Sequence, residues 1–583
     1  MKDMKYLVVL ARAMFATASH ANAQASIQIL GGGSSALFVE LGQAAINGAG
    51  GTGTACRWSL GKNAAILARD ARTSTPTDEQ GNIWVVWTAG SGTCAAPAGS
   101  FNVWSYMSLD STLGDRCYFE VDSSGTPGCV QVMTIGNTVT GTNLLCYPSV
   151  TTCTSFGDNP GTLPSAVSGA LNGQHFFVAG TDILPLDAKF ATYRMLQPCG
   201  QAINRQPFDQ ILRQAYGLGY GTGTTGVGTN VQSFYSTALF HVLDFNITGN
   251  DPINTGAAVP AFTVTTVGAQ PIIVAVGPND TTGSGLNNAT DIPSYVLMNF
   301  YNGSIGRASD LLSSTSTAMQ PWGVTTLVRE PLSGTYNVFE WSLINNSQFH
   351  DSQDGFNCNS SGGVFANPMD LRSLNGKPAN GGGQFAQRRR VIGTGEMVKQ
   401  LNLATDTDNR LGYFFWSAGN ASGLTNVKYL TVNGVDPVQN TYSNGTLPGS
   451  GGPSDPGLGA VTFKSLNAGD YPAWSALRLV SRSPGTTAVA SLVSSLQGLN
   501  TTQHDMITLA NLNVWHSHYY LPVLGSNVSA NGATINTAND LCNTPGALAE
   551  TGGDAGGATI LRVANNDFCQ DFAVTTGLIN KTN

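Results

Sequence analysis

The stretch GVTTLVREPLSGTYNVFEWSLI, residues 323–344, reads as a strand, a turn and a helix in succession. Its first residues form an apolar, β-branched run, which is typical of a buried strand. The turn contains Arg329, followed four residues later by Ser333-Gly334-Thr335. A helix N-terminus presents unpaired N–H groups and the positive end of the helix dipole. Because an arginine and hydroxyl donors stand beside such an N-terminus, the stretch predicts a site for an anion.

Units of the same kind recur along the chain. Residues 25–46 (ASIQILGGGSSALFVELGQAAI), 101–119 (FNVWSYMSLDSTLGDRCYF) and 173–196 (GQHFFVAGTDILPLDAKFATYRML) each predict a strand, a turn and a helix or second strand. Two further apolar runs, at 270–280 and 410–418, predict strands. Units that alternate strand and helix indicate an α/β fold with parallel-rich sheets.

Hydroxyl residues occupy three of these turns: Ser34-Ser35, Thr181-Asp182 and Ser333-Gly334-Thr335. A single Ser or Thr at a helix start is usually only an N-cap. Ligands of open α/β sheets, however, bind at the carboxyl ends of the strands. Turns that converge there from different units would surround an anion with neutral donors.

In this order, the turns resemble those of the periplasmic phosphate-binding proteins, which have the type II solute-binding fold. GGGSSALF at 31–38 is similar to the family's GAGATF-like turn, and FVAGTDILPL at 177–186 to its FGASDAPL-like segment. REPLSGT at 329–335 matches the family's R-x-x-x-S-G-T. The resemblance implies two lobes with an interlobe cleft and long loop insertions. We expect lobe 1 to comprise residues 24–265 and 418–583, lobe 2 residues 266–417, and insertions at 44–100, 118–170 and 343–390.

The resemblance also implies a set of ligand-binding residues. Asp182 would accept a hydrogen bond from a protonated ligand oxygen, and Arg329 would pair with the anion. Ser111 is preferred for the second turn over Ser91, although the neighbouring Asp110 would repel an anion unless it faces away. The full expected set is Ser34, Ser35, Ala36, Ser111, Asp182, Arg329, Ser333, Gly334 and Thr335.

The composition and the N-terminal residues lead us to expect a chain located outside the cytosol. Lys2 and Lys5 precede an apolar stretch, and ANAQA offers a cleavage site, so residues 1–23 are expected to be a signal peptide. Without them the charge balance is 24 − 34 = −10, which argues against a nucleic-acid partner. No later run reaches the roughly 18 apolar residues of a membrane span. The expected location is the periplasm, the medium or the cell surface.

Ten cysteines, an even number, fit disulfides formed in an oxidising compartment. Connectivity cannot be deduced from sequence, and the pairs suggested by spacing are Cys56–Cys94, Cys117–Cys129, Cys146–Cys153, Cys199–Cys358 and Cys542–Cys569.

The sequence contains no catalytic constellation, so we expect no enzyme and no cofactor. His516 and His518 lack nearby acidic or cysteine partners and are expected on an exposed strand, and RRR at 388–390 in a solvated loop. Two functions remain open. One is an extracytoplasmic solute-binding protein for phosphate or a similar tetrahedral oxyanion, for which an ABC-type permease would be a partner. The other is a secreted or cell-surface structural or interaction protein that reuses the fold.

Overall fold

The computed structural model describes most of the strand–turn–helix units. It covers residues 24–51, 54–70, 77–119, 129–134, 139–145, 161–182, 262–277, 286–301, 305–311, 323–329, 333–339, 343, 387–391, 393–402, 409–439, 444–468, 470–482, 485–499, 505–508, 529–530, 533–534, 559–565, 568–575 and 578–579. Several predictions fall outside these residues: the signal peptide at 1–23, the helix after Pro185, the histidines 516 and 518, and the cysteine pairs other than Cys56–Cys94 and Cys117–Cys129.

One mixed sheet runs through the molecule, with the strand order β12-β11-β13-β9-β15-β8-β1-β6-β5-β2. Its strands are β1 (Gln24–Gly33), β2 (Ala55–Leu60), β5 (Asn82–Thr88), β6 (Ser100–Ser108), β8 (Val178–Thr181), β9 (Thr263–Val276), β11 (Val324–Arg329), β12 (Gln387–Val391), β13 (Asn409–Phe415) and β15 (Trp474–Ser481). Three more strands join β9 or each other at its side: β10 (Asp291–Ile292), β14 (Lys428–Val432) and β16 (Ile507–Thr508).

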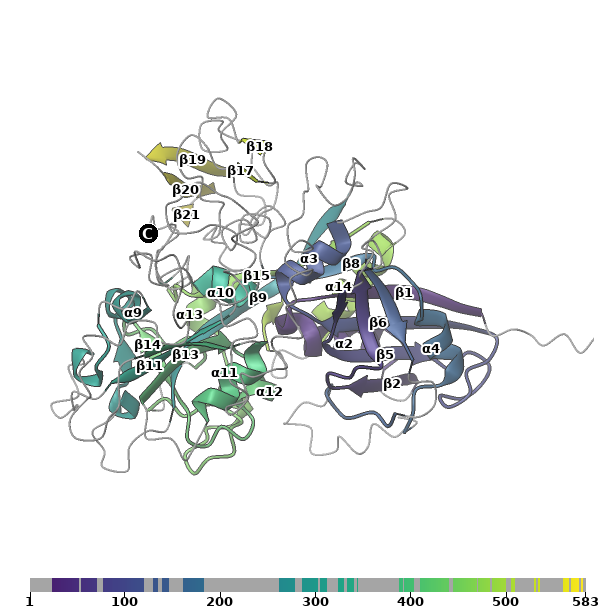
Figure 1. The fold of residues 1–583 in the computed structure, drawn as a ribbon, viewed down its shortest axis with the longest axis horizontal. Helices are drawn as coiled ribbons and strands as arrows, with labels where there is room; N and C mark the ends of the chain where they lie inside the picture. The colour runs from purple at the N-terminus through teal and green to yellow at the C-terminus, as the bar shows by residue number, and fades with distance from the viewer. Residues whose placement is uncertain are drawn as a thin grey trace, which may run out of the picture.

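The long strand β9 belongs to both lobes of the α/β fold. Its first part pairs with β15, from Thr263 to Pro271, and its last part pairs with β13, from Ile272 to Val276. Figure 1 shows β9 and β15 between the two bodies of the molecule. Because one continuous strand pairs within both lobes, it connects them directly.

Parallel pairing joins the strands that carry the predicted turns to their neighbours, and it also joins the short strands β10 and β14. β1 pairs in parallel with β6 and β8, and β11 pairs in parallel with β12 and β13. The carboxyl ends of β1, β6 and β8 therefore lie at one edge. The pairings of β9, β15, β2 and β5 are antiparallel: β9 and β15 run between the lobes, and β2 and β5 form a meander with β6.

Two helical layers cover the sheet of the first lobe, because side chains alternate between its faces. Ile29 of β1 packs with Leu41 and Leu492, which belong to α2 (Phe38–Gly48) and α14 (Gly485–Gln497). Leu30, the next residue, packs on the opposite face with Leu113 and Leu171. That face carries α3 (Ser111–Phe119), α4 (Ser165–Leu171) and a small sheet of β3 (Ile66–Asp70), β4 (Thr77–Glu79) and β7 (Cys129–Met133).

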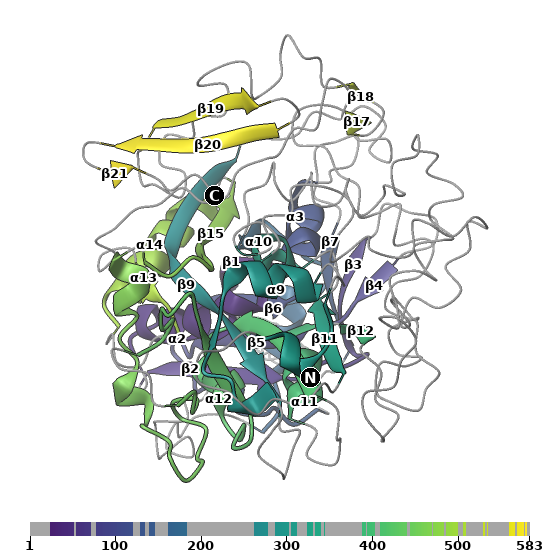
Figure 2. The same cartoon turned by 90° about the vertical axis from the view of Figure 1, so that its left-hand side faces the viewer.

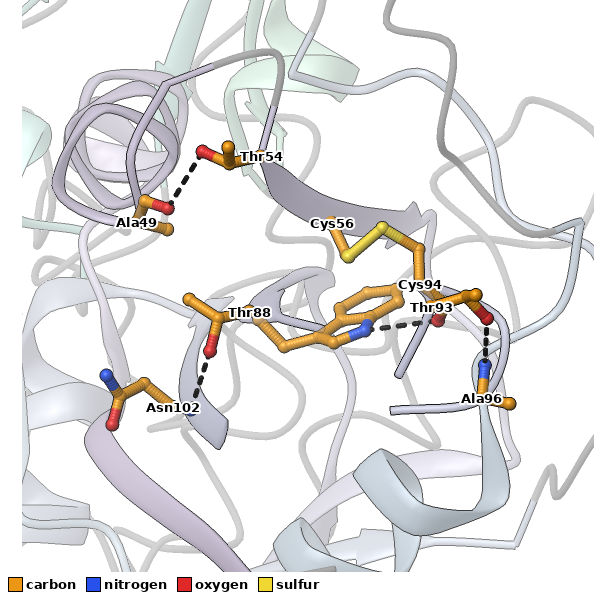
Figure 3. Close-up of a disulfide and its surroundings, with 9 residues drawn as sticks. Ala49, Thr54, Cys56, Thr88, Thr93, Cys94, Ala96 and Asn102 are labelled. Carbon is orange, nitrogen blue, oxygen red and sulfur yellow. Dashed lines mark hydrogen bonds between the residues drawn. A yellow bond between two sulfur atoms is a disulfide. The ribbon is translucent and has the colours of Figure 1, made fainter. Parts of the chain in front are cut away.

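Part of the expected insertion at 44–100 is built into the sheet, which corrects its reading as a loop. β2 and β5 extend the sheet edge beyond β6, and Trp58, Trp84 and Trp87 from these strands are fully buried. The Cys56–Cys94 disulfide joins β2 to the loop that follows β5 (Figure 3). This disulfide and Cys117–Cys129 confirm two of the expected pairs, and none of the cysteines that the structure describes is free.

Removing the first disulfide is expected to destabilise the protein more than removing the second. A crosslink limits the entropy of the unfolded chain, and Cys56–Cys94 closes 38 residues against 12 for Cys117–Cys129. The chain-entropy relation gives losses of about 4 and about 3 kcal/mol respectively. Denaturant unfolding of the two double alanine variants under oxidising conditions measures both; equal stability of the Cys56/Cys94 variant and the wild type would contradict the expectation.

The core around β9, β11 and β13 in the second lobe continues into the first lobe at Tyr118, Phe119 and Ala179. Tyr413 stacks on Phe339, with ring centroids 3.7 Å apart, and Tyr301 packs edge-on against both. The helices here are α9 (Ser294–Tyr301), α10 (Gly334–Phe339), α11 (Gly393–Leu401), α12 (Ala418–Ala421) and α13 (Lys464–Ala468). RRR at 388–390 lies in strand β12, not in a loop, because it pairs with β11. No helix among the described residues is long and apolar enough to span a membrane.

The division of the chain between the lobes remains a prediction. β14 follows residue 418, yet it pairs with β9 and β10, and Leu466 and Tyr471 belong to the same hydrophobic core as β11 and β13. We therefore propose that the second lobe extends to about Tyr471. Near the C-terminus, β17 (Ser529–Ala530) pairs with β18 (Ala533–Thr534), and β19 (Thr559–Asn565), β20 (Phe568–Thr575) and β21 (Leu578–Ile579) form a separate sheet (Figure 2).

Candidate functional site

Two of the predicted residues meet at the carboxyl edge of the first lobe. Asp182 directly follows β8, and Ser111 begins α3 shortly after β6. Both side chains are buried, and the Ser111 hydroxyl donates a hydrogen bond to Asp182 Oδ1. Ser91, the alternative for the second turn, is exposed in the loop after β5. The serine that accompanies Asp182 is therefore Ser111.

Burial dominates the electrostatics of Asp182. It raises the pKa of the carboxyl from 3.8 to about 6, although the hydrogen bond from Ser111 and the charges of Arg329 and Arg478 all favour the ionised form. At neutral pH the group is still mostly a carboxylate, and it becomes a neutral acid only below about pH 6.

Arg329 ends β11 in the second lobe, and its side chain is 1% exposed. Its Nη1 donates to Thr394 Oγ1 of α11 at 3.0 Å, and its backbone N–H donates to the Tyr413 hydroxyl at 3.2 Å. Its Nη2 lies 3.5 Å from Asp110 Oδ1. Asp110 therefore does not face away, as an anion site was expected to require; it pairs with the arginine.

The Ser-Gly-Thr turn begins α10, and Ser333 and Thr335 are buried there. Ser333 Oγ accepts a hydrogen bond from the Tyr336 N–H at 3.2 Å, so this hydroxyl caps the helix. Gly334 touches the first lobe: a Cβ at this position would overlap the carboxylate of Asp182 and lie 2.6 Å from Ser111 Oγ. The start of α10 and the start of α3 therefore lie against each other at the junction of the lobes.

Replacing Gly334 by alanine is expected to separate the two turns. The added methyl overlaps the Asp182 carboxylate, which is buried and accepts a hydrogen bond from Ser111, so this side chain has little room to move. We expect a stability loss of about 1–3 kcal/mol and weaker anion binding. Gly395 in α11, where a Cβ meets nothing within 4 Å, is the matched control, and thermal unfolding compares the two variants. A Gly334→Ala protein as stable as Gly395→Ala would contradict this contact.

The first turn is engaged in the fold. Ser34 Oγ accepts from the Ala36 N–H at 3.2 Å, its N–H donates to Gly180 O at 2.7 Å, and its carbonyl accepts from the Tyr106 hydroxyl at 2.8 Å. Ser34 therefore anchors the turn to β8 and β6. Ser35 is exposed and is not brought into the buried group, while Ala36 is partly buried between two cores.

Sequence reasoning missed Asp110, Thr394 and Arg478 as members of this cluster. Thr394 follows β12 at the start of α11, which is one more strand–turn–helix unit that could have signalled it. Arg478 is a buried arginine in the apolar strand β15, and its charge acts on Asp182. A single arginine within an apolar strand indicates a nearby acidic or polar partner, because burying a charge without one is costly.

A third carboxyl lies behind the junction. Asp115 of α3 is fully buried, and burial raises its pKa well above the ordinary value. A hydrogen bond from Thr181 and the charge of Arg478 oppose that rise, while Asp182 adds to it. The described part of the chain holds no cluster of three histidine, cysteine, aspartate or glutamate residues that could bind a metal ion.

No family model matches the chain, and no curated protein matches it. Solved structures with partial similarity include an ABC-type phosphate transport receptor from Vibrio cholerae, with 14% identity and a TM-score of 0.24 over 41% of this chain and 68% of that one. A phosphate-binding protein from Stenotrophomonas maltophilia has 13% identity and a TM-score of 0.25 over 57% of this chain and 70% of that one. Similarity this low carries no functional weight, so the site rests on the contacts described above.

Proposed function

We propose that the chain is an extracytoplasmic solute-binding protein that holds phosphate or a similar tetrahedral oxyanion where its two lobes meet, without catalysing a reaction. The observation that supports this most is the convergence of Arg329 and Gly334 from one lobe with Ser111 and Asp182 from the other. All four stand where a strand ends or a helix begins, and such positions suit oxyanions.

In this proposal each residue has a distinct role. Arg329 supplies the positive charge, and the start of α10, with Ser333, Gly334 and Thr335, supplies neutral donors. Ser111, whose single O–H donates to Asp182 in the unliganded protein, would turn that O–H to the ligand from the opposite lobe. Asp182 accepts a hydrogen bond from a ligand oxygen that carries a proton. Ser34, Ser35 and Ala36 belong to the first turn, and of these Ser35 is exposed.

The same proposal places the mature protein in the periplasm, in the medium or at the cell surface, and includes an ABC-type permease as the partner that would receive the anion. The disulfides Cys56–Cys94 and Cys117–Cys129 support an oxidising compartment.

A second candidate function is a secreted or cell-surface structural or interaction protein that reuses the fold. The observation that favours it is that charged and polar groups of the site have partners within the protein: Asp110 pairs with Arg329, and Ser111 donates to Asp182. Such internal partners would replace a ligand in a protein that no longer binds one.

Calorimetric titration of residues 24–583 with phosphate at neutral pH separates the two candidates. Saturable 1:1 binding supports the solute-binding function. No heat of binding from a protein that unfolds cooperatively would favour the structural function. Chloride at the same ionic strength is the control for nonspecific anion effects.

A further inference from the structure

Two consecutive residues at the start of α3 contact different lobes. Ser111 donates to Asp182 in the first lobe, and Asp110 lies against Arg329 of the second. The Asp110 carbonyl accepts from the Gly114 N–H at 2.9 Å, which fixes this residue at the helix start. Its side chain is only 13% exposed. Asp110 is thus a positioned carboxylate, held in the same cluster as the proposed ligand-binding residues.

An anion on Arg329 would lie beside Asp110, because both would contact the same guanidinium. An ionised carboxylate can only accept hydrogen bonds. It therefore repels a ligand oxygen unless that oxygen carries a proton. Asp182, at the end of β8, imposes the same condition, so a ligand that contacts both carboxylates meets two acceptors and needs two protons to satisfy both.

The charges around Asp110 also favour a ligand with few negative charges. Arg329 from β11 pairs with Asp110, and the charged groups that act on the nearby Asp182 or Asp115 include Arg478 from β15. With Asp110 they make two positive and up to three negative charges, so the cluster is neutral or negative as a whole. A monoanion is easier to place there than a dianion.

We propose, on the basis of the function proposed above, that Asp110 and Asp182 together make the site selective for tetrahedral oxyanions that carry two protons and one negative charge, such as dihydrogen phosphate. Hydrogen phosphate, with one proton, satisfies only one of the two carboxylates. Sulfate satisfies neither. Asp110 is thereby a specificity-determining residue for the protonation state of the ligand.

Phosphate titrations between pH 6.5 and 8.5 test this, because phosphate loses its second proton near neutral pH while Asp182, with a pKa of about 6, stays ionised. The wild-type association constant is expected to fall about tenfold per pH unit on the alkaline side, a loss of about 1.4 kcal/mol each. Asp110→Asn removes one charge and adds a donor, so its affinity should fall much less with pH and exceed that of the wild type about tenfold at pH 8.5.

Asp470→Asn, which removes an exposed carboxylate, is the charge-matched control and should behave as the wild type. Asp110→Ser is a second variant that also caps a helix, should the asparagine variant fail to fold. Wild-type affinity that is constant over this pH range, or an Asp110→Asn profile equal to that of the wild type, would overturn the inference and leave the proposed function standing. Absence of phosphate binding at every pH would overturn both.

Discussion

Replacing Asp182 by asparagine is expected to weaken the discrimination between phosphate and sulfate. The wild-type carboxylate accepts a hydrogen bond from a phosphate proton but faces only lone pairs on sulfate. A site built to hydrogen-bond one group rejects an analogue that lacks it by roughly 10⁴-fold. Asparagine keeps an oxygen for the hydrogen bond from Ser111 and adds an NH₂ donor, which suits sulfate. Phosphate and sulfate affinities at pH 7.5 measure the ratio, with Asp470→Asn as control.

Acid should have the same effect on the wild type. Because the pKa of Asp182 is raised from 3.8 to about 6, the group gains a proton as the pH falls through about 6 and becomes a donor itself. Sulfate binding should therefore improve below pH 6 in the wild type and stay constant in Asp182→Asn. Equal affinities of the wild type for phosphate and sulfate at pH 7.5 would refute the role assigned to Asp182.

The unliganded Asp182→Asn protein should also be more stable than the wild type at pH 8. A raised carboxyl pKa means that the folded state disfavours the ionised form, so wild-type stability increases as the pH falls from above 6 toward 4. A rise in pKa from 3.8 to about 6 corresponds to about 3 kcal/mol lost in the ionised form. Thermal unfolding at pH 8 and at pH 4 compares the proteins, and the gap between them should narrow at the lower pH.

Replacing Arg329 by alanine is expected to weaken binding of every anion alike. The guanidinium is the charge closest to the proposed ligand, and its removal leaves the Asp110 carboxylate without this partner. Truncating one partner of a buried charge pair costs about 2–5 kcal/mol, and the middle of that range corresponds to a loss of roughly 10²–10³-fold in affinity. Phosphate and sulfate should both lose affinity, so their ratio changes little.

Titration of Arg329→Ala with both anions measures this effect, and Arg307→Ala, which removes an exposed arginine, is the control. Arg329→Lys keeps the positive charge but lacks the forked geometry of the guanidinium. Its anion affinity should lie between those of the wild type and Arg329→Ala. Undiminished phosphate binding by Arg329→Ala would exclude Arg329 from the site. Circular dichroism of each variant shows whether a loss of binding reflects a loss of fold.

The local elements of the fold follow from the sequence because their signals are local. The apolar run before Arg329 forms β11, the run before Ser34 forms β1, and each is followed by a helix at the expected place. For the segment at 44–100 the prediction was wrong in part. Its glycine- and threonine-rich ends suggested a surface insertion, but β5 pairs with β6 and β2 with β5, and Trp58, Trp84 and Trp87 of these strands are buried.

For the candidate site, the sequence alone identified the residues whose chemistry is visible one turn at a time: Asp182 after its strand, and Arg329 before Ser-Gly-Thr. It also indicated that strand ends with hydroxyl residues would lie together. Only the tertiary structure decided that Asp110 pairs with Arg329, that Thr394 and Arg478 join the cluster, and that Gly334 abuts Asp182. These contacts join residues from opposite lobes or distant strands. Their partners depend on how β9 and β15 bring the lobes together, which no local pattern of residues encodes.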